Sequence, residues 1–361
     1  MGALLLFVAA GASPSAAQQE IWRTDFDKKA VDMDEIVSGG PPKDGIRAVD
    51  LPRFVSVEEA DEWIGDREPV AVVRLGGEVK AYPLQILIYH EIVNDQVGGE
   101  FVSVTYCPLC NTTLAFDRRF DGRLLDFGTT GRLRHSDLIM YDRQTETWWQ
   151  QATGEGLIGE YAGEELTFIP APLLSWRDVK DQSPEAKVLS RETGFDRPYG
   201  RNPYVGYDRQ GPFPDYFKGK RDRRLPMMER IVALREGDRT VAVPFSELED
   251  HRVAGLDLGT RNVVVFWAPG TASAVDNGRI DRGRDVGSSA VFDARADGRP
   301  LTFEPEGDGR FRDRETDSLW NMSGQAVDGE LLGTQLDEVA HGNHFWFAWA
   351  AFLPDTEVWE G

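Results

Sequence analysis

The sequence predicts an α+β fold that is mainly antiparallel β-sheet and consists of two tandem copies of one α+β unit. Three observations support this prediction. Short β-branched and aromatic runs, separated by Gly, Pro and Asp-Gly turn signals, outnumber segments with helical periodicity. Several motifs recur in the same order in the second half, and 361 residues suffice for two units of ordinary size. The second copy is degenerate because it lacks the cysteines of the first.

The first copy begins with two strands and a helix. Residues 69–75 and 78–82 flank a Gly-Gly turn, which is typical of a hairpin. Pro83 can open a helix, and residues 84–93 carry apolar side chains on one side, so they predict that helix. Residues 101–106 are β-branched and predict a strand that runs directly into a cysteine pair.

The remaining elements of the first copy are strands. Residues 114–127 predict a hairpin around Asp121-Gly122, a strong turn signal. Residues 138–150 and 166–169 predict further strands. The aligned pairs of segments in the two copies are 81–84 with 242–245, 107–110 with 268–271, 116–123 with 292–299 and 142–145 with 313–316.

These patterns divide the chain into five predicted segments. They are a signal peptide (1–17), an N-terminal approach segment (18–60), a first repeat unit (61–190), a connector rich in Pro, Gly and Tyr (191–227) and a second, degenerate repeat unit (228–361). The connector is either a plain linker or a segment that packs over the units.

Composition and the N-terminus bear on location and partners. The net charge of −21 disfavours binding to nucleic acid or to an anionic membrane surface. A short apolar run followed by Ser15-Ala16-Ala17 predicts a secretory signal, and no later segment is long and apolar enough for membrane insertion. We therefore expect a soluble, exported protein, periplasmic or extracellular.

The motifs resemble a known family. Tyr82-Pro83-Leu84, the segment from His90 to Asp95, the segment from Val104 to Thr112 and the segment from Met140 to Thr145 are together similar to the DUF3179 family. That family is a domain of unknown function, often found in exported proteins. The resemblance covers roughly Gly45 to the C-terminus and supports export, but it implies no established activity.

Cys107 and Cys110 are the only cysteines, and their CxxC spacing places two thiols close together. Three interpretations stay open. The pair can cycle between dithiol and disulfide, it can bind a soft metal ion, with copper as Cu(I) the first candidate, or it can form a static disulfide. One CxxC does not supply the four ligands expected of a structural zinc site.

Three residues are candidates to complete the site, and two further histidines give a weaker metal signal elsewhere. His135 lies in the loop 131–137, which the second copy shortens, so this loop and the thiols are lost together. An imidazole there can act as a third metal ligand or take a thiol proton. His90 is a further candidate ligand, although its counterpart His251 persists without thiols, and Glu91 is a candidate catalytic residue. His341 and His344 have a helical metal-ligand spacing, which we consider a weaker signal.

The sequence therefore predicts an exported protein with one CxxC-centred site for thiol redox chemistry or copper binding. It does not decide between an enzyme and a carrier, and the partner is a small molecule or a redox partner protein. The alternative is a non-catalytic module in which Trp and Tyr side chains hold a carbohydrate or peptide while the cysteines form a structural disulfide.

Overall fold

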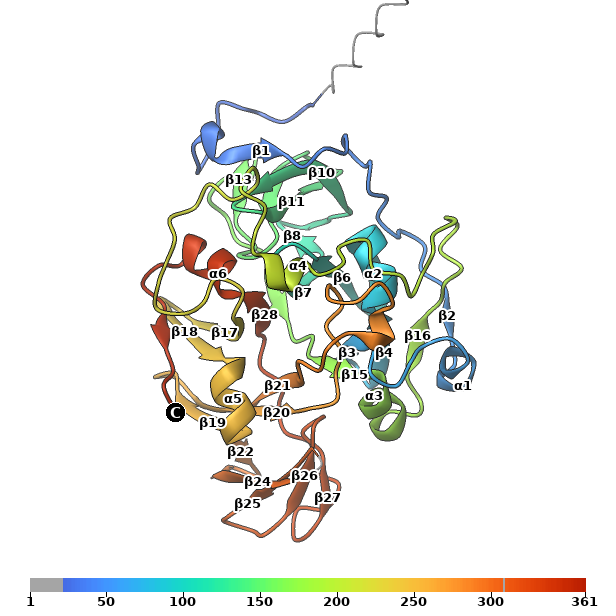
Figure 1. Cartoon of the computed structure of the whole chain (residues 1–361), viewed down its shortest axis with the longest axis vertical. Helices are drawn as coiled ribbons and strands as arrows, with labels where there is room; N and C mark the ends of the chain where they lie inside the picture. Colours follow the sequence, from blue (N-terminus) through green and yellow to red (C-terminus); the bar gives the residue numbers. More distant parts are fainter. Residues whose placement is uncertain (1–21, 308) are drawn as a thin grey trace, which may run out of the picture.

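The computed structural model describes residues 22–361 except residue 308. The predicted signal peptide, residues 1–17, lies outside these described residues. The fold is α+β and mainly antiparallel β, as the sequence predicts (Figure 1). Two large sheets form its centre, and short helices connect their strands.

The first large sheet, sheet I, has the strand order β29-β18-β17-β28-β7-β6-β5, and β14 also pairs with β7. Its strands are β5 (Ile92–Val97), β6 (Glu100–Cys107), β7 (Thr112–Asp117), β14 (Phe168–Ile169), β17 (Arg230–Glu236), β18 (Arg239–Pro244), β28 (Gly342–Phe345) and β29 (Glu357–Val358). All its pairs are antiparallel except β18 with β29.

The second large sheet, sheet II, has the order β19-β20-β21-β15-β3-β4-β16-β2. Its strands are β2 (Phe54–Val55), β3 (Pro69–Leu75), β4 (Glu78–Pro83), β15 (Leu173–Ser175), β16 (Lys187–Leu189), β19 (Val253–Asp257), β20 (Asn262–Ala268) and β21 (Ser288–Asp293). The first five residues of β3 are buried, which explains its continuous apolar sequence.

Two small sheets lie at opposite ends of the long axis of the molecule (Figure 1). One contains β1 (Ile36–Ser38), β10 (Phe127–Arg134), β11 (Asp137–Asp142), β12 (Trp148–Gln150) and β13 (Gly156–Ile158). The other contains β24 (Phe303–Gly307), β25 (Arg310–Asp313), β26 (Leu319–Asn321) and β27 (Ala326–Asp328). Two hairpins complete the strands: β8 (Arg119–Phe120) with β9 (Arg123–Leu124), and β22 (Arg295–Ala296) with β23 (Arg299–Pro300).

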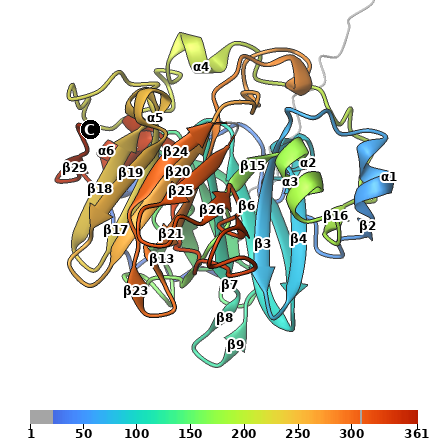
Figure 2. The same cartoon turned by 90° about the horizontal axis from the view of Figure 1, so that it is seen from below.

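The helices are short and lie at the ends of strands. They are α1 (Val57–Asp61), α2 (Leu84–His90), α3 (Trp176–Gln182), α4 (Tyr207–Gln210), α5 (Phe245–His251), α6 (Trp346–Phe352) and the 3-10 turns η1 (Met33–Glu35) and η2 (Ile280–Arg282). Seen from below, α4 and η2 lie along one edge of the molecule, opposite the β8–β9 hairpin (Figure 2). Among the described residues, no helix has the length and apolar character needed to cross a membrane.

Helix α2 begins after Pro83, as the sequence predicts, but it ends at His90 rather than at residue 93. The reason is local, because Glu91 adopts a left-handed conformation with φ of 58°. The chain then enters β5, where Ile92 pairs with Thr105 of β6. The β-branched residues 92 and 93 are thus used in a sheet rather than in a helical turn.

Each large sheet contains strands from both predicted repeat units. In sheet I, β28 of the second unit lies between β17 of the same unit and β7 of the first unit. In sheet II, β15 of the first unit lies between β3 of the same unit and β21 of the second unit. The units, if defined by sequence, therefore do not form separate bodies, because they share both sheets.

Candidate functional site

The cysteines occupy the end of β6 and the turn that follows it. Cys107 is the last residue of β6 and pairs with Thr112 at the start of β7. The carbonyl of Cys110 accepts hydrogen bonds from the N–H of Phe345, at 2.8 Å, and from the Thr112 hydroxyl, at 3.3 Å. Asn111 adopts φ of 53° to close the turn. Both thiols are free, and both side chains are buried.

Asp137 joins the two cysteines. One ligand atom from each of Cys107, Cys110 and Asp137 lies within 4.8 Å of the others. Asp137 begins β11, and its Oδ2 accepts hydrogen bonds from the Gln150 amide, at 2.7 Å, and from the N–H of Ala152, at 2.9 Å. Within the described chain, its Oδ1 accepts no well-formed hydrogen bond. One oxygen is thus anchored, while the other remains available beside the thiols.

Burial keeps the two thiols of this cluster protonated at pH 7. It raises the pKa of the Cys107 and Cys110 thiols, and the charge of Asp137 raises both pKa values further. Burial also raises the pKa of Asp137 to about 6, although hydrogen bonds from Gln150 and Ala152 oppose the shift. A buried thiol with a raised pKa is a poor nucleophile, because only the thiolate attacks.

Glu91 lies beside this cluster. Its left-handed conformation places it directly after α2, its N–H donates to the Leu87 carbonyl at 2.6 Å, and its carbonyl accepts from the N–H of Tyr106 at 2.8 Å. Burial raises the pKa of its carboxyl to about 8, and the charge of Asp137 contributes to the shift. Two buried acids and two buried thiols therefore converge, and no cationic side chain is among the main causes of their pKa shifts.

The connector packs over this site rather than acting as a plain linker. Tyr207 in α4 is 2% exposed. Tyr207 belongs to the same buried cluster as Cys107 and Cys110, and Tyr204 packs against that cluster. The carbonyl of Tyr216 accepts a hydrogen bond from the N–H of Ser136 at 2.9 Å. The connector thus separates the cysteines from solvent.

The structure does not bring the predicted histidines into the thiol cluster. The His135 ring packs against Phe352, and its Nε2 lies 3.4 Å from a Glu35 carboxylate oxygen. The His90 ring is held at both nitrogens, by the Arg47 carbonyl and the Tyr199 hydroxyl, each at 2.6 Å. Glu91 is thus the predicted residue that the fold places beside Asp137 and the cysteines.

His341 and His344 lie on extended chain rather than on a helix, because His344 belongs to β28. The Nδ1 atom of His344 contacts the Thr112 hydroxyl at 2.9 Å, and Nδ1 of His341 donates to the Val339 carbonyl at 2.8 Å. Burial lowers the pKa of His341 to about 4 and that of His344 to about 3, so both imidazoles are neutral at pH 7.

Sequence reasoning missed Asp137, although the signal was present. Asp137 is the last residue of the loop 131–137, which the second copy shortens where it lacks the thiols. The co-loss of this loop and the thiols thus indicated the segment that contains the third member of the cluster. The carbonyl of Ser136 contacts the Cys107 thiol at 3.8 Å, so the backbone after His135 approaches the site, while the His135 ring turns toward Glu35.

The fold and the site define a mainly antiparallel β protein with a buried dithiol–carboxylate cluster under an aromatic connector. A family model described as "Protein of unknown function (DUF3179)" matches residues 43–356, nearly the whole chain. The chain belongs to this family. No curated protein and no solved structure matches the chain.

Proposed function

We propose that this protein binds one thiophilic metal ion through Cys107, Cys110 and Asp137. The observation that carries the proposal is the convergence of these three ligand atoms within 4.8 Å in a buried site. Four acidic groups, counting Glu91, cannot all ionise in a buried space without a positive charge. A metal ion supplies that charge and replaces the protons, because thiol ligands bind as thiolates.

Copper is the metal that we propose from the sequence, because two thiolates favour Cu(I). The Asp137 carboxylate makes Zn²⁺ the main competitor, since zinc accepts both cysteine sulfur and carboxylate oxygen. The carboxyl of Glu91 interacts electrostatically with Asp137, so a cation bound at the cluster would favour the loss of the Glu91 proton. We further propose that the protein is exported and acquires its metal outside the cytoplasm.

Thiol redox chemistry is the second candidate. It is favoured by two free thiols in contact range of the Asp137 carboxylate, which can accept a thiol proton. The burial of both sulfurs and the raised pKa of Cys107 argue against attack on an external disulfide. A single ion needs less space to enter than a partner protein, so metal binding is the better supported function.

The experiment is a metal analysis with matched variants. The wild-type protein, Cys107→Ser, Cys110→Ser and Asp137→Asn are purified without chelator, and metal per chain is measured by mass spectrometry. Ser103→Ala is the control, because Ser103 is a fully buried residue on the same strand whose hydroxyl has no partner among the described residues.

We expect about one equivalent of copper or zinc in the wild type and in Ser103→Ala, and a large loss in the three site variants. A metal-free wild type that also fails to take up added Cu(I) or Zn²⁺ would reject the metal site. In that case, alkylation and mass analysis after equilibration with glutathione buffers would show whether the pair cycles as a dithiol.

We also propose that the chain arose by duplication of one unit. Asp142 and Asp313 support this idea, because each accepts hydrogen bonds from a threonine three residues later and from a tryptophan indole seven residues later. The second unit would then have kept the scaffold and lost the thiols.

A further inference from the structure

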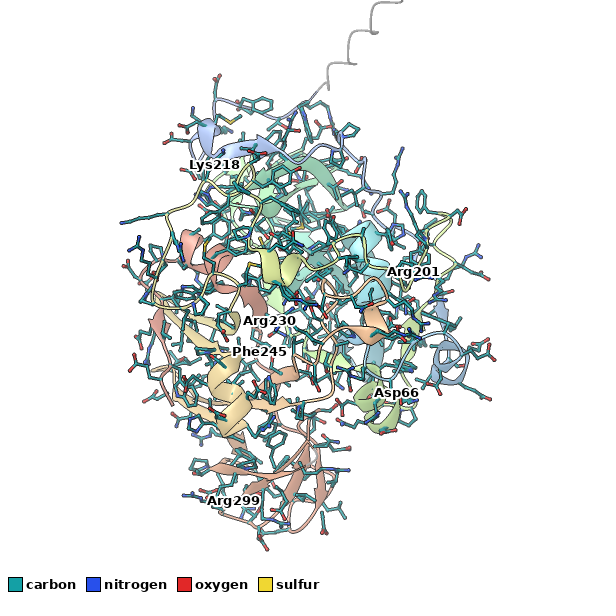
Figure 3. All side chains as sticks on the ribbon, in the orientation of Figure 1. Asp66, Arg201, Lys218, Arg230, Phe245 and Arg299 are labelled. Atoms are coloured by element: carbon teal, nitrogen blue, oxygen red, sulfur yellow. The ribbon has the colours of Figure 1, made fainter. Side chains whose placement is uncertain are left out.

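A pocket of about 390 Å³ lies at the end of α5 and β20, where the second half has no cysteines. Its walls include Arg230, Phe245, Arg252, Trp267 and Arg284. Arg230 and Phe245 lie close together near the centre of the view in Figure 3. The pocket is separate from the cysteine site, and none of its lining residues belongs to that site.

Arg252 has the same backbone environment as Glu91. Each residue follows its helix in the left-handed conformation, with φ of 58° at Glu91 and 64° at Arg252. The N–H of Arg252 donates to Leu248, and its carbonyl accepts from Trp267, as those of Glu91 do with Leu87 and Tyr106. The same position therefore carries an acid beside the thiols and a guanidinium beside this pocket.

Two buried donors at this pocket lack acceptors. Among the described residues, Nη1 of Arg252 and Nε1 of Trp267 have no hydrogen-bond partner. The guanidinium lies 4.5 Å from the centre of the Trp267 ring, which fixes the two groups relative to each other. The indole is 4% exposed and packs so closely on Gly287 that a Cβ there would lie 2.2 Å from the ring.

The nearby charges are mixed and disfavour an anion with more than one charge. Arg230 and Arg284 share one carboxylate, that of Asp208, at 3.1 Å each, so these two guanidiniums are only partly neutralised. The carboxylates of Glu229, Glu249 and Asp285 also line the pocket, and those of Glu229 and Asp285 accept hydrogen bonds from backbone N–H groups. These acids repel a ligand that carries several negative charges.

We propose that this pocket binds a small ligand through one carboxylate, which accepts hydrogen bonds from Arg252 and from the Trp267 indole. A buried donor without a partner is costly, and a carboxylate has two oxygens that can accept from these donors. Arg230 and Arg284 contribute positive potential. This binding site does not depend on the metal proposal, because no residue is shared.

The test follows the Trp267 indole N–H by ¹H–¹⁵N NMR, with Trp267→Phe used to assign its signal. The protein is titrated with sodium acetate, and separately with sodium chloride, phosphate and citrate at matched ionic strength. Arg252→Gln is compared with Arg295→Gln, an exposed arginine elsewhere that bonds to the Gly298 carbonyl, so both variants lose one positive charge.

We expect acetate to shift the Trp267 signal saturably, and Arg252→Gln to weaken this binding by roughly 10-fold or more. Arg295→Gln should bind acetate as the wild type does. The proposal fails if chloride gives the same shift, if acetate gives none, or if citrate or phosphate binds more tightly than acetate. If Arg252→Gln does not fold, the titration of the wild-type protein still shows whether acetate binds beside Trp267.

Discussion

The Gln150 amide donates to Oδ2 of Asp137 at 2.7 Å, and the other carboxylate oxygen of Asp137 is left beside two thiols. Gln150 lies on β12, next to β11, which begins with Asp137. The hydrogen bond between the two side chains therefore fixes the orientation of the carboxylate. Gln150 is therefore a positioning residue for the site. A ligand held in this way needs little reorganisation when an ion binds.

Replacing Gln150 by Leu should weaken metal binding without removing a ligand. The change leaves Oδ2 with only the Ala152 N–H, so the carboxylate can rotate. We expect metal affinity to fall about 10- to 100-fold. Competition with a chromophoric chelator measures the metal affinity. An unchanged affinity would show that the hydrogen bond from Gln150 to Asp137 does not contribute to metal binding. Ser103→Ala serves again as the control.

Metal binding at pH 7 should release about three protons. The pKa values of both thiols are raised and that of Glu91 is about 8, so these three groups are protonated, whereas Asp137, with a pKa of about 6, is mostly ionised. Calorimetry in buffers of different ionisation enthalpy counts the protons. Glu91→Gln should reduce the count by one, and an equal count in both proteins would exclude Glu91 from the titration.

The metal-free protein should lose stability as the pH rises toward 8. The pKa of Glu91 is about 8 in the folded protein and near 4.5 when unfolded, so only the folded state holds this proton between those values. The stabilisation is complete below about pH 4.5 and is lost as the pH passes through 8. Its size is on the order of several kcal/mol, since one pKa unit corresponds to about 1.4 kcal/mol.

Denaturant unfolding of the metal-free protein at several pH values between 5 and 9 measures this change in the free energy of unfolding. Glu91→Gln carries no titrating group there, so its stability should decline less over the same range. Asp137 also makes the folded protein less stable as the pH rises, but over a lower pH range, because its pKa is raised to about 6. Parallel curves for wild type and Glu91→Gln would refute the role given to Glu91.

Asp313→Asn should destabilise the fold without affecting the metal. The buried carboxylate of Asp313 accepts hydrogen bonds from Thr316 and from the Trp320 indole, and an amide cannot accept all of them. We expect a loss of about 2–4 kcal/mol in the free energy of unfolding. Chemical denaturation measures it, and metal analysis of the same sample should give the wild-type content.

The sequence predicted much of the fold, because local signals were strong. Residues 69–75 form a strand with those bounds, and the Asp121-Gly122 turn joins two short strands. The pairing of β28 with β7 was not predictable, since Asn343 meets Thr113 across more than half of the chain. Long-range pairing depends on packing that the local pattern does not encode.

The candidate site was predicted in part. The CxxC pair and Glu91 lie together, because β6 and the turn after α2 are adjacent through the Tyr106–Glu91 hydrogen bond. Asp137 was missed in favour of His135, two residues away. Ser136 and His135 both have positive φ, so the chain bends there, and this reverses the direction expected for the side chains. No sequence period reveals such a bend.

The hydrogen bond from Phe345 to the Cys110 carbonyl has a consequence for biogenesis. The turn that carries the thiols is braced by β28, a strand that lies far along the chain from the turn itself. A nascent chain must therefore extend past Phe345 before this turn acquires its final shape. Under the proposed function, a metal ion would be captured only after that point.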